Sequence, residues 1–241
     1  MEALICVAGK ATRMRKVLED QNVTAKCLVK VGGRSLLRHA IREVEKYSPK
    51  RITVVASPEA LTPVREEATC ASVPIRVLPQ EDYGFTGTTA AVLSGLAGVE
   101  ESCLITWSDM LFALPDEDPR WWARNIAFVS GMSQAYSQRF DAVTCSGEQL
   151  VAFSPRSVPR QGPFLATTGV YHLVHVAEFR DIAMEMKAMF AGRELPVEAV
   201  FQKMLPACPF FVDAILRFID VGTTEAYYAV SELLTGDPSH P

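Results

Sequence analysis

Residues 3–14 read ALICVAGKATRM, an apolar run followed directly by small and polar residues. The run ALICVA is typical of a strand buried on both faces, and the residues after it are typical of a strand-to-helix turn. In a parallel sheet such a turn lies at the carboxyl end of a strand, where backbone N–H groups can bind phosphate oxygens. The stretch lacks the spacing of a Walker loop or of a GxGxxG fingerprint, so these residues alone are equally consistent with a plain surface turn.

The same succession of strand, loop and helix continues through the first half of the chain. Strand-length apolar runs alternate with segments of helical apolar spacing. We expect strands at ALICVA, RITVVA, PIRVL and CLITW, and helices over 35–47, from Ser57-Pro58 onward and over 87–98. Ser57 is expected as the N-cap of its helix, with Pro58 at the first helical position. This alternation predicts right-handed βαβ units and an α/β fold with a mostly parallel sheet.

The pattern changes near Leu114. Residues 115–125 (PDEDPRWWARN) form a turn-rich connector in which Trp121 and Trp122 are expected to pack rather than to stack on a base. Shorter strand-like pieces follow, then two helical patterns, one more strand-like piece and a last helix. They cover 125–131, 141–146, 149–154, 167–174, 177–192, 197–205, 215–222 and 223–234. We expect one domain over residues 1–241, with a mixed-sheet second half.

Composition limits the classes of function. The chain has 241 residues, is 49% hydrophobic and carries a formal charge of −4, which disfavours a general nucleic-acid binder. Its six cysteines form no CxxC pair, which favours a reducing compartment. No apolar run has the length of a signal-peptide core or a spanning helix, so we expect a cytoplasmic protein without nucleic-acid or membrane partners.

Four blocks of sequence occur in a characteristic order. The first is AGKATRM (8–14) followed by AKCLVKVGGRSLL (25–37), and the others are GTTAA (87–91), CLITWSDMLF (103–112) and FIDVGTTEAY (218–227). Together they resemble the signature of the sugar-1-phosphate nucleotidyltransferases, also called nucleotide-sugar pyrophosphorylases. The resemblance covers nearly the whole chain and implies a three-layer α/β/α Rossmann-like (GT-A) fold with a mixed, mostly parallel central sheet.

The resemblance also implies a reaction and a set of roles. A phosphate oxygen of an acceptor attacks the α-phosphorus of a nucleoside triphosphate, and pyrophosphate leaves. Arg13 is expected to hold the leaving pyrophosphate, Lys26 to contact the attacking and α phosphates, and Asp109 and Asp220 to bind Mg²⁺. The implied nucleotide contacts are Ala8, Gly9, Lys10, Ala11, Thr12, Gln80, Gly87 and Thr88, and the implied acceptor contacts are Arg156 and Gly169. Residues 1–112 would form the nucleotide-binding half and 113–241 the acceptor-binding half, which includes the second metal aspartate.

The sequence departs from the family pattern at several positions. Ala11 replaces a loop glycine, and its Cβ is expected to restrict positive φ and close phosphate approach. Ala25 replaces the proline before the lysine, and Ser108 replaces the glycine before the aspartate. Where many members have F-x-E-K-P, residues 153–157 read FSPRS, so the acid is lost while Arg156 could still meet a phosphate. Residues 167–171 read TTGVY where the family often has N-A-G-(I/V)-Y.

Three functional hypotheses therefore remain. The first is an Mg²⁺-dependent nucleotidyltransferase acting on a sugar 1-phosphate. The second keeps the reaction but uses CTP and a phospho-alcohol or phosphonate such as phosphocholine, which the altered sugar-site motif favours. The third is a non-catalytic relative that senses nucleotides. The base and the acceptor stay open and a homodimer is possible, and because little sequence follows Leu234 we expect no hexapeptide β-helix.

Overall fold

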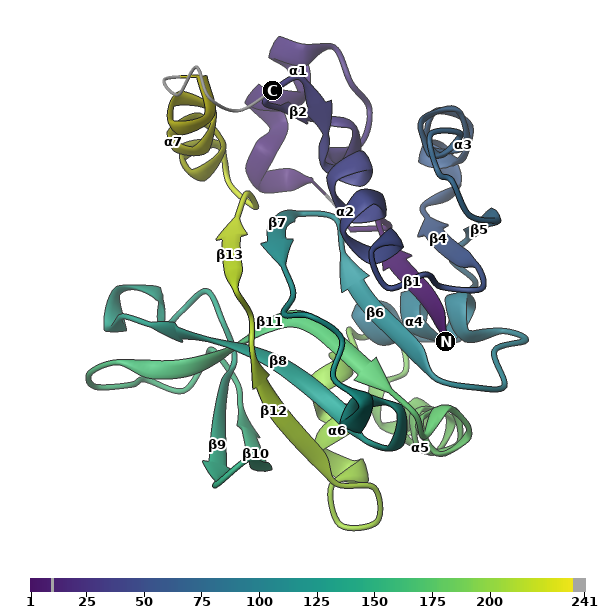
Figure 1. The fold of residues 1–241 in the computed structure, drawn as a ribbon, viewed down its shortest axis with the longest axis vertical. Helices are drawn as coiled ribbons and strands as arrows, with labels where there is room; N and C mark the ends of the chain where they lie inside the picture. The colour runs from purple at the N-terminus through teal and green to yellow at the C-terminus, as the bar shows by residue number, and fades with distance from the viewer. Residues whose placement is uncertain (10, 236–241) are drawn as a thin grey trace.

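A nine-stranded sheet forms the centre of the computed structural model, which describes residues 1–9 and 11–235 (Figure 1). The strand order is β5-β4-β1-β6-β11-β8-β12-β10-β9. Strands β5, β4, β1 and β6 run parallel, as do β8 and β12, whereas β11 and β10 run antiparallel to their neighbours. The sheet is therefore mixed and mostly parallel, which confirms the α/β prediction. The strands are β1 (Glu2–Cys6), β4 (Ile52–Ala56), β5 (Ile75–Pro79), β6 (Cys103–Trp107), β8 (Asn125–Met132), β9 (Ala142–Ser146), β10 (Gln149–Ser154), β11 (Phe164–Leu173) and β12 (Phe210–Ala214).

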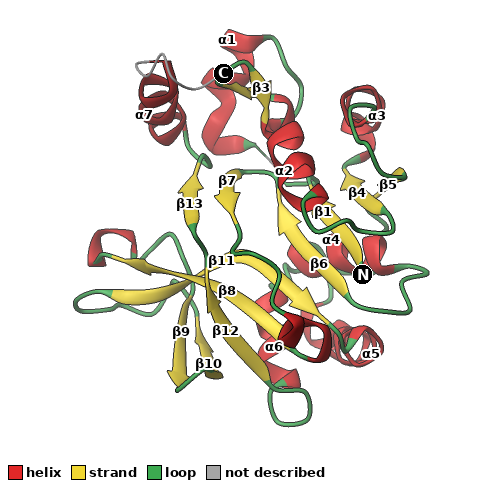
Figure 2. Ribbon diagram, viewed as in Figure 1, coloured by secondary structure: helices red, strands yellow, loops and turns green. Residues whose placement is uncertain are grey.

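Helices cover both faces of this sheet (Figure 2). On β1, Leu4 faces a buried cluster that includes residues of α4, α5 and α6, whereas Ile5 faces a second cluster with α2 and α3. This alternation is the two-residue period of a strand buried on both faces, and it confirms the three-layer architecture. The helices are α1 (Arg15–Gln21), α2 (Leu36–Glu45), α3 (Leu61–Ala68), α4 (Thr88–Leu96), α5 (Val176–Glu185), α6 (Val197–Met204) and α7 (Thr224–Thr235).

Two short antiparallel pairs lie outside the main sheet: β2 (Lys30–Val31) with β3 (Arg34–Ser35), and β7 (Met110–Ala113) with β13 (Arg217–Asp220). The second pair starts two residues after β6 and connects the main sheet to α7 (Figure 1). A third apolar cluster, which includes Met14, Val17 and Val221, packs the segment after β1 against the start of α7. Segments from both ends of the chain are thereby joined near the carboxyl ends of the parallel strands.

Several elements differ from the sequence-based expectation. Ser57 makes no side-chain cap bond and precedes a 3₁₀ turn, so α3 begins only at Leu61. The helix expected over 177–192 ends at Glu185 and continues as a 3₁₀ segment, Met186–Phe190. Helix α1 and strand β12 are not foreseen by the sequence. The seven residues of α1 are too few for a clear helical period, and β12 is only partly buried, so it lacks the continuous apolar run of the parallel strands.

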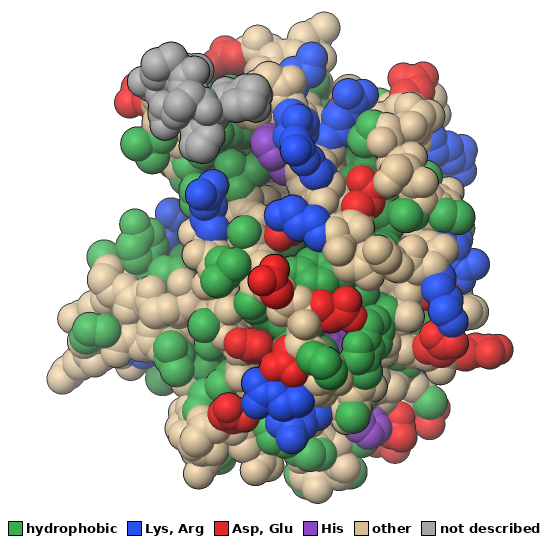
Figure 3. Space-filling view, viewed as in Figure 1, with side chains coloured by type: hydrophobic (Ala, Val, Ile, Leu, Met, Phe, Trp, Pro, Cys, Tyr) green, Lys and Arg blue, Asp and Glu red, His purple; other side chains and the backbone are tan. Residues whose placement is uncertain are grey.

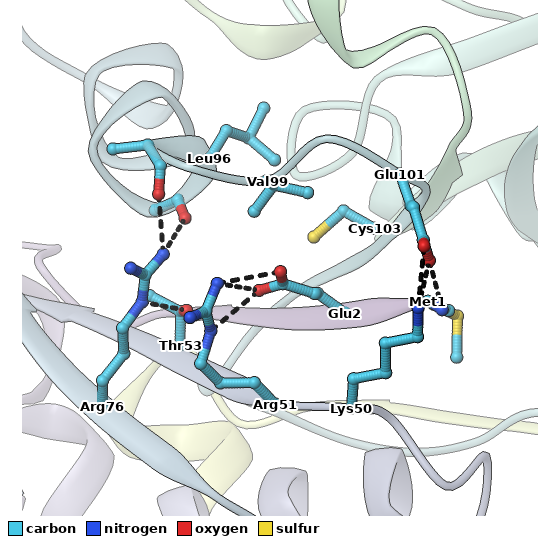
Figure 4. Close-up of polar contacts among 12 residues, drawn as sticks. Met1, Glu2, Lys50, Arg51, Thr53, Arg76, Leu96, Val99, Glu101 and Cys103 are labelled. Carbon is cyan, nitrogen blue, oxygen red and sulfur yellow. Dashed lines mark hydrogen bonds and ion pairs between the residues drawn. The ribbon is translucent and has the colours of Figure 1, made fainter.

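Ion pairs connect the strands at their amino ends, the edge of the sheet opposite the loop that follows β1 (Figure 4). Arg51 binds both carboxylate oxygens of Glu2, with Nη2–Oε1 at 2.8 Å, and Lys50 Nζ lies 2.7 Å from Glu101 Oε1. Arg76 donates to Thr53 Oγ1 at 2.8 Å. These contacts connect β1 to the segment that precedes β4, that segment to the one that precedes β6, and β5 to β4. Among the described residues, no helix is long and apolar enough to cross a membrane.

Candidate active site

The loop after β1 runs along the carboxyl edge of the sheet. Val7 N still bonds to Val55 O at 2.8 Å, and Ala8 and Gly9 then lead away from the strand. Ala11 has a φ of −82°, and its carbonyl accepts from Met14 N at 3.0 Å. Because this φ is negative, the Cβ of Ala11 causes no backbone strain, so the part of the expectation that concerned positive φ does not apply. The restricted approach of a phosphate stays a prediction. Lys10, an expected phosphate contact, lies outside the described residues.

Thr12 and Arg13 form a 3₁₀ turn directly after this loop. Both side chains are exposed, while the neighbouring Met14 is fully buried and anchors the turn. The Arg13 carbonyl accepts from Thr224 Oγ1 at 3.2 Å, which joins the turn to the first residue of α7. Within the described chain Arg13 forms no ion pair with a carboxylate, so its guanidinium is available to an anion.

Lys26 points into the site from a second 3₁₀ turn, Lys26–Leu28. Its neighbours Ala25 and Cys27 are buried in the cluster beneath α2, which turns the Lys26 side chain away from the core. Lys26 Nζ lies 2.8 Å from Asp109 Oδ2, and the two side chains are 15% and 36% exposed. The sequence places these residues 83 positions apart, and only the fold brings them together.

Asp109 and Asp220 lie side by side because β7 pairs with β13. Val221 N donates to Asp109 O at 3.0 Å, and Asp220 is opposite Met110 in the strand register. Asp220 Oδ1 accepts from Gly222 N at 2.7 Å, and Oδ2 pairs with Arg139.

Gly222 allows a close approach of charged groups. A Cβ at this position would lie 2.6 Å from Asp220 Oδ1 and 3.3 Å from Lys26 Nζ. Lys26, Asp220 and the Gly222 backbone therefore converge on one small volume, in which a larger residue would displace a functional group. The family motif supplies this glycine two residues after the second aspartate, and the structure gives the steric reason.

The two carboxylates fit a magnesium ion better than a transition metal. Mg²⁺ commonly binds one or two protein carboxylates and takes its remaining oxygens from water and phosphate. Across residues 1–9 and 11–235, no group of three or more His, Cys, Asp or Glu side chains could hold a metal, so a closed protein cage of the zinc type is absent from this part of the chain. Lys26 and Arg139 each neutralise one of the two aspartates in this structure.

The predicted nucleobase segment lies at the start of α4. Gly87 has a φ of +97°, and a Cβ there would collide with Glu194. The Thr88 hydroxyl accepts from Val197 N at 2.9 Å, so it caps the first turn of α6. Gln80 directly follows β5, and its N–H donates to Ala56 O at 2.9 Å. Gln80, Gly87 and Thr88 lie at the carboxyl edge of the sheet. The Thr88 hydroxyl already accepts a hydrogen bond from Val197 N.

The predicted acceptor residues lie in the second half of the chain. Gly169 has a φ of +78°, and a Cβ there would lie 3.2 Å from Met110 Cε and 3.4 Å from Trp107 Cε3. Since Trp107 and Met110 flank Ser108-Asp109, the structure brings Gly169 close to the first aspartate. Arg156 is exposed, and its backbone N–H donates to Asp141 Oδ1 at 2.7 Å.

Two charged residues of this region carry no signal in the sequence. One is Arg139, whose Nε is buried without a hydrogen-bond partner among the described residues while its Nη2 binds Asp220. The other is Glu198, which accepts from the Tyr171 hydroxyl at 2.8 Å. Burial raises the pKa of Glu198 to about 7, with the Asp141 charge acting in the same direction and Arg156 opposing it. Neither residue lies in a recognisable motif, so no local signal could have identified them.

Comparisons with known proteins assign the chain to a protein family. The profile of the MobA-like NTP transferase domain matches residues 3–159, more than half of the chain, and the chain therefore belongs to that family. It is thus a nucleotidyltransferase, as the four sequence blocks predicted.

Individual relatives are more distant. The chain is 27% identical over 150 residues to the bifunctional protein GlmU of Cereibacter sphaeroides, and the match covers 61% of this chain and 32% of GlmU. The chain thus spans about a third of that relative's length. A solved UDP-glucose pyrophosphorylase complexed with UDP-glucose has a TM-score of 0.74 at 14% identity and covers 98% of both chains. The inositol-1-phosphate CTP transferase from T. maritima has a TM-score of 0.74 at 17% identity, covering 97% of this chain and 94% of that one. These two similarities concern the fold.

Proposed function

We propose that this enzyme joins a nucleoside triphosphate to a sugar 1-phosphate, giving a nucleotide-sugar and pyrophosphate. The observation that carries the proposal is the convergence of Lys26, Asp109 and Asp220 at the carboxyl edge of the parallel strands. A phosphate oxygen of the acceptor forms a bond to the α-phosphorus, and the bond from that phosphorus to the bridging oxygen of pyrophosphate breaks. No protein group is consumed, so positioning and charge neutralisation supply the catalysis.

The basic residues have distinct tasks in this proposal. Lys26 leaves Asp109 to contact the attacking and α phosphates, and Arg13 holds the β and γ phosphates that depart as pyrophosphate. Arg139, with its unpartnered Nε, is suited to donate two parallel hydrogen bonds to a phosphate. Asp109 and Asp220 would hold Mg²⁺, which supplies partial neutralisation of the phosphate charge.

The remaining contacts divide between the two halves of one domain. In residues 1–112 we assign the backbone from Ala8 to Thr12 to the triphosphate, and Gln80, Gly87 and Thr88 to the base. In residues 113–241, Arg156 and Gly169 face the acceptor. We place the enzyme in the cytoplasm, in line with its reduced cysteines, and a homodimer remains a prediction.

A second candidate substrate is a phospho-alcohol or phosphonate activated with CTP. The specific support is the FSPRS segment, which carries no carboxylate for a sugar hydroxyl. The structural neighbour named as an inositol-1-phosphate CTP transferase has the same fold. Arg156 suits either acceptor, because both present a phosphate or phosphonate group.

The test is pyrophosphate release with Mg²⁺ across the four nucleoside triphosphates and a panel of sugar 1-phosphates, phosphocholine and aminoethylphosphonate. One productive pair with a sugar 1-phosphate supports the first proposal, and one with an alcohol phosphate or phosphonate replaces it with the second. If no pair reacts while nucleotides still raise the melting temperature, the nucleotide-sensing alternative is correct and both transfer proposals are wrong.

A further inference from the structure

A second concave site lies apart from the transfer centre. It is an open depression of about 580 Å³ bordered by the β2–β3 hairpin, α2, α3, β13 and α7, and its size is typical of small-molecule sites. Its charged lining consists of Lys30, Arg34, Arg38, Arg42, Arg217 and Glu67, and we call it the basic pocket. Lys26, Asp109 and Asp220 are not among its lining residues.

The charge of the basic pocket is opposite to that of the chain. The chain carries −4 overall, yet five cationic side chains and one carboxylate line this pocket. Glu67 is already engaged, because its Oε1 lies 2.7 Å from Arg38 Nε and accepts from Ser35 Oγ at 2.5 Å. Between described residues, no carboxylate forms an ion pair with Lys30, Arg34, Arg42 or Arg217. Within residues 1–9 and 11–235, four positive charges of the pocket lining therefore have no carboxylate partner.

The cationic side chains line the same pocket and are not scattered over the surface. Arg38 and Arg42 lie four residues apart on α2 and so share a helix face, and Arg34 immediately precedes the N-cap of that helix. His39, which also lines the pocket, has its pKa lowered by burial and further by the charges of Arg34 and Arg42. Figure 3 shows Lys and Arg side chains gathered around a histidine in the part of the molecule where α2 and the β2–β3 hairpin lie.

We propose that the basic pocket binds a small phosphorylated ligand with at least two negative charges. Guanidinium groups bind phosphate oxygens bidentately, and several of them around one volume repel each other until an anion is bound. The size of the pocket suits a small phosphate ester or pyrophosphate. A long polyanion is disfavoured, because the rest of the chain carries a net negative charge. This proposal does not depend on the transfer reaction, since it concerns different residues.

The experiment is calorimetric titration of inorganic pyrophosphate and inorganic phosphate into the full chain with EDTA present. The test variant is Arg34→Gln/Arg42→Gln, and the control is Arg65→Gln, an exposed arginine of α3 outside the pocket. A Lys26→Met chain, titrated in parallel, weakens binding at the transfer centre and so separates that contribution from binding in the basic pocket. We expect the double variant to lose about ten-fold or more in affinity, since charge-assisted hydrogen bonds are lost, while the Arg65→Gln and Lys26→Met chains keep the pocket's affinity.

Two results would overturn the proposal. One is unchanged pyrophosphate affinity in the double variant, and the other is an equal loss in Arg65→Gln, which would indicate general surface charge. A change in self-association of the double variant with unchanged pyrophosphate affinity would assign the pocket to an acidic protein surface and also exclude the small ligand. Folding is checked by the melting temperature without ligand, which we expect to be equal or higher in the double variant. If that variant does not fold, Arg217→Gln serves as the readout.

Discussion

Lys26 Nζ and Asp109 Oδ2 are 2.8 Å apart, although 83 residues separate them in the chain. The pair lies at the carboxyl edge of the sheet, and the Lys26 side chain is only 15% exposed. In the proposed reaction, a lysine held beside the carboxylate that is expected to bind Mg²⁺ is positioned to move to a phosphate when substrate arrives. The pair therefore neutralises both side chains in the absence of substrate.

Replacing Lys26 by Met should reduce kcat by about 100-fold or more, because a positioned charge is lost from the transition state. The melting temperature should change little, since a partly exposed ion pair contributes about 1 kcal/mol or less. Lys50→Met is the control, because it removes a lysine–carboxylate pair of similar length, though more exposed, at the opposite edge of the sheet. Equal turnover of the two variants, measured by pyrophosphate release, would remove Lys26 from the catalytic site.

Replacing Asp109 or Asp220 by Asn should raise the Mg²⁺ concentration needed for half-maximal activity by about ten-fold or more, because each change removes a charged oxygen ligand. The measurement is a magnesium activation curve at saturating nucleotide. Asp213→Asn, a residue of β12 that bonds to Trp121, is the control. A magnesium midpoint equal to that of the unmodified chain in both aspartate variants would contradict the metal assignment.

Gly222→Ala should impair activity more than stability. The new Cβ would lie 2.6 Å from Asp220 Oδ1 and 3.3 Å from Lys26 Nζ, so the carboxylate must move from its position beside Gly222 N. Gly131→Ala on β8 is the control, because a Cβ there meets no atom within 4 Å. Steady-state kinetics and thermal melts of the two variants separate the effects, and normal kcat in Gly222→Ala would show that the close approach is dispensable.

Stability should depend on pH through Glu198. Its pKa in the folded chain is about 7, raised from 4.5 mainly by burial. The folded state thus holds this proton more tightly than the unfolded state, so the contribution of Glu198 is complete below pH 4.5 and is lost as pH rises through 7. Glu198→Gln, which can still accept from Tyr171, should raise stability by about 1–3 kcal/mol at pH 8 and by almost nothing at pH 4.5. The measurement is thermal melting of Glu198→Gln at pH 4.5 and pH 8. The control is Glu178→Gln, which changes an exposed carboxylate of α5. A stability difference that is the same at both pH values would refute the prediction.

Arg156→Ala should raise the KM for the acceptor while leaving kcat nearly unchanged, because an exposed guanidinium that binds the acceptor's phosphate contributes equally in the ground and transition states. Arg65→Ala is the control, since Arg65 is equally exposed on α3. An acceptor KM equal to that of the control would place Arg156 outside the acceptor site.

The sequence predicted the fold class and most of the first half correctly, because buried parallel strands are continuous apolar runs and their helices have clear periods. The strands at 52–56 and 103–107 follow this rule. The sequence was less accurate at α1, whose seven residues carry no clear helical period, and at β12, which is only partly buried and is not a continuous apolar run. In the loop after β1, Ala11 adopts a negative φ, so the replacement of glycine at this position causes no backbone strain.

The sequence by itself determined the class of this protein, since the order and spacing of its blocks identify a nucleotidyltransferase. Only the tertiary structure decided which charged side chains lie close together. Pairing of β7 with β13 places Asp220 beside Asp109, and folding brings Arg139, Glu198 and the lining of the basic pocket to positions that no motif marks. The physical reason is that local periodicity encodes which face of an element is buried, whereas contacts between charged side chains depend on how distant elements pack.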